Sequence, residues 1–351
     1  MCSSDLYHGG GPAMNRWGCA CLLFAALFRA TGQPSGIEAP VAGFVVDAQT
    51  HSIRPINGLP GSSLLGQPLT LDTQVQTARF SGGGDYALAT VKDPPGRLVL
   101  IQGLKGRTPY ARDLADAIVS VDFISLNDNG SAAICSMASS QLQFVTGLPG
   151  APVFSAPIDL TPVQGLVAGI SIGSQGQIAL VAASDGSYGG IYEVASQNAS
   201  VELITRANQP SAATYLNRDR DVVFADPFLN EVILVQDIHG GKLFSVLVGP
   251  ADHVETPVAL QAIDGGVAVA NSGSKNIVQY DFSAGRIVAD IPLPVVPAAL
   301  DNLTIRGVFV VNRTGTGPLY LYSSSDSSVR FVPPPIVSAL HDAVSGRSGV
   351  H

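Results

Sequence analysis

The sequence predicts an all-β chain built from one repeated four-stranded unit. Charged residues make up only 13% of the 351 residues, whereas 46% are hydrophobic and 38 are glycine. That mixture suits many buried strands joined by tight turns. Short apolar runs also alternate with polar residues along most of the chain, as in strands with one buried face. Finally, similar hairpins recur about every 44 residues, a spacing typical of repeat folds.

The N-terminus contains two segments that we exclude from the repeat. In residues 14–32, Arg16 precedes a short apolar run and the small residues "ATG", the pattern of a cleaved secretory signal peptide. The run is too short for a membrane-spanning helix, so we expect no membrane span in the mature chain. Residues 1–13 precede this pattern, and their "CSSDL" matches the translation of a common sequencing-library adapter. We therefore interpret residues 1–13 as a non-native leader and assign residues 33–351 to the folded domain.

One kind of hairpin occurs seven times after the leader. A clear copy is "IVQYDFSAGRIVADI", two alternating runs joined by a polar turn. The copies begin at Gly43, Leu98, Leu142, Ile191, Val232, Ile277 and Leu319. A second kind of hairpin, such as "VALQAIDGGVAVAN", precedes six of these seven. The unit therefore has four strands, named a, b, c and d in chain order.

A four-stranded unit of this length predicts one blade of a β-propeller. A single blade cannot bury both of its faces, but blades packed around an axis can. We predict seven blades, with one blade closed by segments from both ends of the chain, because closure hides open sheet edges. Ile336–His341 would supply the inner strand of the blade whose outer strands begin at Gly43. Its b strand is missing, although Gly58–Leu71 offers a substitute, and six full blades plus a hairpin is the alternative.

One unit also resembles a known family. In "VANSGSKNIVQYDFSAGRIVADIPL", residues 269–271 stand where the YVTN-type repeat of secreted bacterial and archaeal propellers has its V-T/A-N. The later positions that match are Gly273, Asn276, Val278, Asp281, Val288 and Ile291. The resemblance implies a propeller located outside the cytoplasm. It implies no single activity, because such scaffolds include both binding proteins and enzymes such as lactonases.

Charge and cysteine content restrict the classes of function. The formal net charge is -8 and the chain has no run of basic residues, so we expect no binding to nucleic acid. Cys135 is the only cysteine after the predicted signal peptide, which excludes an intramolecular disulfide in the mature chain. It lies in the apolar run "AAICSM", and we expect a buried, unreactive thiol.

Motifs for catalysis or metal binding are absent or misplaced. "GISIG" matches the G-x-S-x-G pattern of hydrolases, but Ser171 falls within an expected inner strand and no helix follows. The histidines after the leader are isolated, and "NRDRD" at residues 217–221 lacks the glycine and distant glutamate of a calcium loop. We therefore predict no catalytic residue, no metal and no cofactor.

Two groups of residues are candidate binding positions. In a propeller, the b–c and d–a connections lie on one face, here called the loop face, where function is common. The candidates on this face are Tyr110, Arg112, Asp113, Tyr188, Asp226, Asn230, Asn271, Lys275 and Arg313. Polar residues expected on inner strands could line a central channel: Asp122, Gln261, Asp264, Asp301 and His341.

The preferred function is a secreted or periplasmic, non-enzymatic propeller. We expect a monomer that binds a protein, peptide or glycan through its loop face. The alternative is a lactonase-like propeller hydrolase that uses axial carboxylates and a divalent metal.

Overall fold

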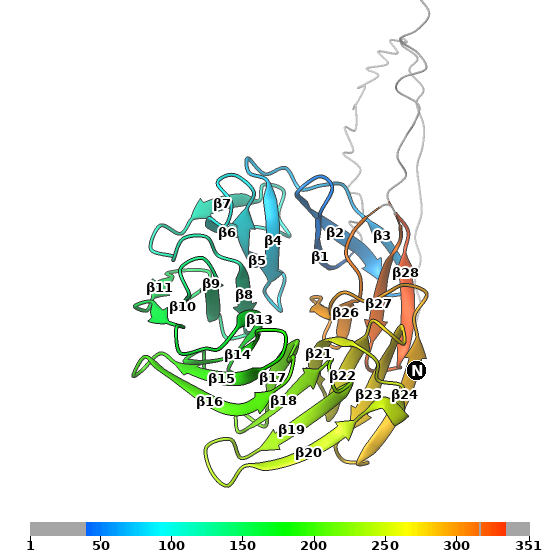
Figure 1. The fold of residues 1–351 in the computed structure, drawn as a ribbon. Coiled ribbons are helices and arrows are strands. Elements are labelled where there is room, and N and C mark those ends of the chain that lie inside the picture. Colours follow the sequence, from blue (N-terminus) through cyan, green and yellow to red (C-terminus); the bar gives the residue numbers. More distant parts are fainter. Residues whose placement is uncertain (1–39, 316, 335–351) are drawn as a thin grey trace, which may run out of the picture. The chain divides into compact units, whose positions relative to one another are not determined.

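Seven antiparallel sheets follow one another along the chain and form a seven-bladed β-propeller (Figure 1). The computed structural model describes residues 40–315 and 317–334. These residues form strands and one short 3-10 helix, η1 (Pro250–Asp252). The predicted leader, the predicted signal peptide and Ile336–His341 lie outside the described residues. None of the described helical structure has the length and hydropathy that a membrane crossing requires.

The strands group into blades in chain order. Blade 1 contains β1 (Val41–Asp47), β2 (Ser52–Leu59) and β3 (Ser62–Leu65). Blade 2 contains β4 (Val75–Phe80), β5 (Tyr86–Val91), β6 (Leu98–Gln102) and β7 (Tyr110–Asp113). Blade 3 contains β8 (Phe123–Leu126), β9 (Ala132–Ser136), β10 (Gln141–Thr146) and two short outer pieces, β11 (Val153–Phe154) and β12 (Ile158–Asp159). Blade 4 contains β13 (Leu166–Ile172), β14 (Ile178–Ser184), β15 (Gly189–Ala195) and β16 (Ser200–Ala207).

The remaining blades have the same layout. Blade 5 contains β17 (Ala212–Leu216), β18 (Asp221–Asp226), β19 (Glu231–Gln236) and β20 (Leu243–Val248). Blade 6 contains β21 (Pro257–Ile263), β22 (Gly266–Asn271), β23 (Asn276–Asp281) and β24 (Arg286–Pro292). Blade 7 contains β25 (Asp301–Asn302), β26 (Val308–Val310), β27 (Leu319–Ser323) and β28 (Ser328–Val332). In blades 2 to 7 both kinds of hairpin therefore form as the sequence predicts.

Blade 1 corrects one detail of the prediction. The hairpin at Gly43 supplies strands b and c, not c and d. β1 is almost wholly buried and packs against β4 of the next blade, as the b strands β14 and β18 pack against β17 and β21. β3 contacts β28, the outer strand of blade 7, so β3 is strand d. No b strand is missing, β1–β3 form a true seventh blade, and no described residue fills its inner position.

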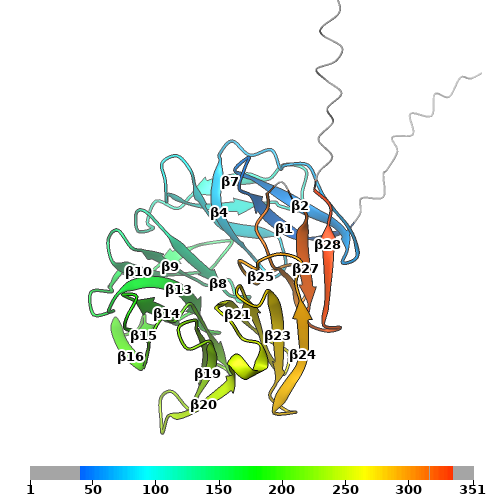
Figure 2. The ribbon, with the colours of Figure 1, turned by 45° about the vertical axis from the view of Figure 1, so that its right-hand side comes forward.

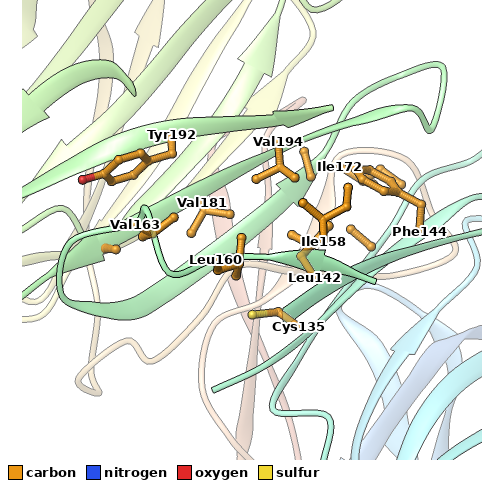
Figure 3. Close-up of a cluster of buried hydrophobic side chains, with 13 residues drawn as sticks. Cys135, Leu142, Phe144, Ile158, Leu160, Val163, Ile172, Val181, Tyr192 and Val194 are labelled. Carbon is orange, nitrogen blue, oxygen red and sulfur yellow. The ribbon is translucent and has the colours of Figure 1, made fainter. Parts of the chain in front are cut away.

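The core lies between blades. Strand a is innermost and strand d outermost, and the inner strands of neighbouring blades contact one another (Figure 2). Strand b is buried on both faces in β5, β9, β18 and β22, which explains why these strands consist mostly of valine, alanine and other apolar residues. The resulting clusters join successive blades. In blades 3 and 4, Leu142 and Phe144 pack with Val181 and Val194 (Figure 3).

Cys135 belongs to this cluster and has no exposed surface. Burial, with a smaller contribution from the charge of Asp122, raises the pKa of its thiol to about 12. The thiol is therefore uncharged at neutral pH and unreactive, as the sequence predicts.

The clusters between blades predict a sharp contrast in stability. Leu142→Ala would leave a cavity between blades 3 and 4 and is expected to lower the free energy of unfolding by about 2–5 kcal/mol. Leu243→Ala is the matched control, because Leu243 is 65% exposed, and its effect should stay within about 0.5 kcal/mol. Urea unfolding followed by fluorescence measures both. Equal effects of the two substitutions would contradict the assignment of the core.

Candidate functional site

The two faces of the propeller differ in their exposed side chains. On the loop face, the b–c and d–a connections expose the large apolar side chains of Val119, Met137, Tyr188, Phe228, Leu229 and Val296. Among the described residues, the a–b and c–d turns of the opposite face expose none. Leu59, Tyr110, Val153 and Leu243, at strand ends that adjoin c–d turns, are exposed as well. Exposed apolar side chains within the connections of the loop face are typical of an interaction surface.

The opposite face is occupied by polar contacts between blades. Asp219, in an a–b turn, accepts hydrogen bonds from the backbone and hydroxyl of Ser174 in the previous blade, at 2.7–2.9 Å. The amide of Asn127 donates in turn to the carbonyl of Gly173, at 2.9 Å. Arg306 pairs with Asp264 across blades 6 and 7. These turns hold neighbouring blades in register, and residues 217–220 of "NRDRD" form the a–b turn of blade 5.

Two of the predicted loop-face residues are buried. Asp226 and Asn271 end strands β18 and β22 and have no exposed surface. The Asp226 carboxylate accepts hydrogen bonds from the backbone of Asn208 at 2.8 Å and of Phe228 at 3.1 Å. It thereby fastens the d–a connection to the b–c turn that presents Phe228. These side chains position the loop face and do not form its surface.

Four predicted residues do lie in b–c connections. Tyr188 is 71% exposed, and Lys275 and Arg313 are also exposed. Asn230 is half-buried, and its side-chain oxygen accepts a 2.7 Å hydrogen bond from the backbone of Thr256. This bond ties blade 5 to the connection that enters blade 6.

Three candidates from blade 2 lie elsewhere than predicted. Tyr110, Arg112 and Asp113 form β7, the outer strand, and not the d–a connection. The prediction is wrong because the c–d turn spans residues 103–109, which shifts the last strand further along the chain. Only Asp113 reaches toward the loop face, where its carboxylate pairs with Arg97 of the b–c connection.

The structure does not bring the predicted axial residues together at one place. Gln261 and Asp301 lie on the inner strands β21 and β25. Asp301 pairs with Arg79 of β4 at 2.9 Å, a cation that sequence reasoning missed. Asp264 is in the tight a–b turn of blade 6, not on the inner strand, because β21 already ends at Ile263.

The other two axial candidates do not join that pair. The Asp122 carboxylate folds back to accept a 2.7 Å hydrogen bond from the backbone of Met137 and so caps a b–c turn. His341 lies outside the described residues. The axial carboxylates whose positions are known are therefore paired or capping.

Ser171 lies near the end of β13, which runs through a turn directly into β14. The strand–turn–helix geometry of a nucleophile elbow is therefore absent at this position. Within residues 40–315 and 317–334, no three His, Cys, Asp or Glu side chains gather closely enough to hold a metal ion.

A groove of about 600 Å³ opens on the loop face between blades 5 and 6. Its polar lining comes from three connections, the start of β23 and the outer strand β24: Asn230, His253, Glu255, Ser274, Asn276 and Asp290. His253 Nδ1 lies 2.6 Å from Asp290 Oδ2, and the amide of Asn276 donates to Asp290 Oδ1 at 2.7 Å. Sequence reasoning identified Asn230 but missed His253 and Asp290, which are 37 residues apart and share no motif.

Comparison with known proteins identifies the architecture. No family model matches the chain, and no curated protein matches its sequence. A functionally unknown protein from Desulfotomaculum acetoxidans is similar in structure, with a TM-score of 0.57 and 13% identity over 84% of this chain and 99% of that one. Virginiamycin B lyase from Staphylococcus aureus has a TM-score of 0.53 and 15% identity over 83% and 91%.

A nidogen/laminin complex has a TM-score of 0.51 and 10% identity over 71% of this chain and 92% of that one. At such low identities the likeness is one of fold alone.

The b–c turn of blade 1 shows how a loop-face turn is held. Asp47 is buried and accepts hydrogen bonds from the backbone of Gln49 at 2.9 Å and from the side chain of Arg54 at 2.8 Å. Burial alone would raise the pKa of the Asp47 carboxyl. The hydrogen bonds from Gln49, Thr50 and Arg54 outweigh burial and lower this pKa below its ordinary value of 3.8.

This pair predicts a pH-dependent loss of stability. Asp47→Ala leaves Arg54 buried without its partner and is expected to cost about 3 kcal/mol at pH 7. Because the folded-state pKa is lowered, the contribution of Asp47 is complete above pH 3.8 and declines as the pH falls below it. Guanidinium unfolding between pH 7 and 3 should show the two proteins converging in acid.

The control is Asp264→Ala, which removes an exposed ion pair and should cost less than about 1 kcal/mol. A difference between wild type and Asp47→Ala that stays constant down to pH 3 would refute the role of the Asp47 carboxylate.

Proposed function

We propose that this chain is an extracytoplasmic, non-enzymatic propeller that binds a protein or peptide through its loop face. The observation that carries the proposal is the confinement of exposed apolar side chains of the connections to that face. Interfaces draw most of their binding energy from a few such side chains, aromatic ones above all. Tyr188 and Phe228 are the aromatic members, and they lie in successive blades.

The turns that carry Tyr188 and Phe228 are held by hydrogen bonds, and this rigidity supports the same function. Phe228 lies in a turn held by the buried Asp226 carboxylate. The backbone of Tyr188 donates to Asp185 Oδ1 at 2.7 Å, in a turn that is itself hydrogen-bonded. Side chains fixed before binding lose less conformational entropy when a partner docks. The loop face is therefore preorganised.

Location outside the cytoplasm is the second part of the proposal. Its support is the signal-like segment at residues 14–32 and the resemblance of residues 269–293 to the YVTN-type repeat of secreted propellers. Protein binding also has a structural parallel, since one of the similar structures is a complex of nidogen with laminin. The alternative, a hydrolase with axial carboxylates, has less support because Asp301 is paired with Arg79 and Asp122 caps a turn.

Selection of random peptides tests the binding face. Peptides selected on the purified chain should bind the double variant Tyr188→Ser, Phe228→Ser at least tenfold more weakly, because both substitutions remove apolar contact area. The double variant Leu243→Ser, Val246→Ser on the outer strand β20 is the control and should bind normally. Dissociation constants from fluorescence anisotropy measure both. Equal binding by all three proteins, or no selectable peptide, would refute the loop face as the site.

A further inference from the structure

The groove between blades 5 and 6 lies beside Phe228 and Leu229 on the loop face. If the loop face binds a peptide, as proposed above, this groove determines part of what the peptide must contain. Its polar lining includes two carboxylates and one imidazole but no lysine or arginine among the described residues. An acidic groove with this lining favours a cationic group.

The hydrogen bonds inside the groove decide which atoms remain for a ligand. Both oxygens of Asp290 are engaged, one by Asn276 and the other by His253. A carboxylate only accepts hydrogen bonds, so His253 Nδ1 carries the proton and donates it. When the imidazole is uncharged, its other nitrogen, Nε2, is a hydrogen-bond acceptor. Asn276 also donates to the backbone carbonyl of His253 at 3.2 Å, which fixes the position of that residue.

Glu255 supplies the remaining charge. Its carboxylate has no hydrogen-bond partner among the described residues, and its side chain lies against Gly273. A β-carbon at Gly273 would come within 2.5 Å of the Glu255 side chain, so glycine makes this close approach possible. Ser274 donates its hydroxyl proton to Asn276 at 2.8 Å, which leaves its oxygen free to accept. The open polar atoms of the groove are therefore mostly acceptors.

The apolar part of the lining suits a long side chain. Val254 is buried, and Pro250 and Pro292 complete the apolar surface of the groove. Lysine and arginine bury an apolar stem and present their donors at its end. A groove with apolar walls and acceptors matches that distribution.

The connection that forms the groove is fixed in shape. The helix η1 starts after Gly249, whose backbone donates to Asp252 at 3.0 Å. His253 and Thr256 both have left-handed backbone conformations, with φ of 61° and 50°. Such conformations are unfavourable for these residues and persist where surrounding contacts hold them. The bond from Thr256 to Asn230 is one such contact.

We propose that this groove binds the arginine or lysine side chain of a partner peptide. The cation pairs with the Glu255 carboxylate, and an adjacent apolar residue of the peptide packs on Phe228. Lys275, exposed in the neighbouring turn, opposes the cation and limits its affinity.

Four peptide mixtures test the inference. Each mixture has one fixed position, occupied by arginine, lysine, norleucine or glutamate, with the other positions random. On the immobilised wild-type chain, the arginine and lysine mixtures should be retained at least fivefold more than the norleucine and glutamate mixtures. Glu255→Gln should abolish this preference, and Lys275→Gln should increase it. Glu202→Gln, an exposed carboxylate on β16, is the matched control and should change nothing.

The outcomes separate this inference from the proposed function. Phe228→Ser should reduce retention of all four mixtures, because it removes an apolar contact that every peptide can use. Equal retention of the four mixtures on wild type, or a preference that survives Glu255→Gln, would overturn the cation site while the binding face stands. If wild type retains no mixture, both proposals fail.

Discussion

Burial of the second strand of each blade on both faces is the constraint on which the structure depends. These strands lie between two neighbouring sheets, so almost every side chain in them is removed from water. Small and β-branched residues allow the sheets to approach closely. No blade could satisfy this requirement alone, and the ring is therefore a condition for the stability of each unit.

The polar chemistry of the two faces follows from that ring. On the opposite face, a–b turns exchange hydrogen bonds from blade to blade, as between Ser174 and Asp219. On the loop face, the buried carboxylates of Asp47 and Asp226 accept hydrogen bonds from the backbone of the turns that follow them. The exposed side chains of those turns take no part in these hydrogen bonds and can therefore be apolar. The same scaffold can therefore vary its binding surface without loss of its core.

Prediction from the sequence succeeded where the signal was local. Alternation and turn residues placed both hairpins of six blades, and the apolar run around Cys135 indicated its burial. Prediction failed where two arrangements share the same local pattern. The hairpin at Gly43 looks like any other pair of strands, and only its contacts with β4 and the position of β3 beside β28 make it strands b and c. Likewise, the longer c–d turn of blade 2 moved Tyr110 into a strand.

The sequence by itself determined the all-β class and the repeat, because the repeat period and the turn residues can be recognised from neighbouring residues. It favoured seven blades over six plus a hairpin, and the structure decided for seven. It also indicated that loop-face turns matter, and Asn230 was found that way. Only the tertiary structure decided which polar residues meet. His253 and Asp290 come from a connection and an outer strand, and Arg79 reaches Asp301 from another blade. Such pairs form only when blades pack against one another. The packing of segments far apart in the sequence cannot be recognised from neighbouring residues.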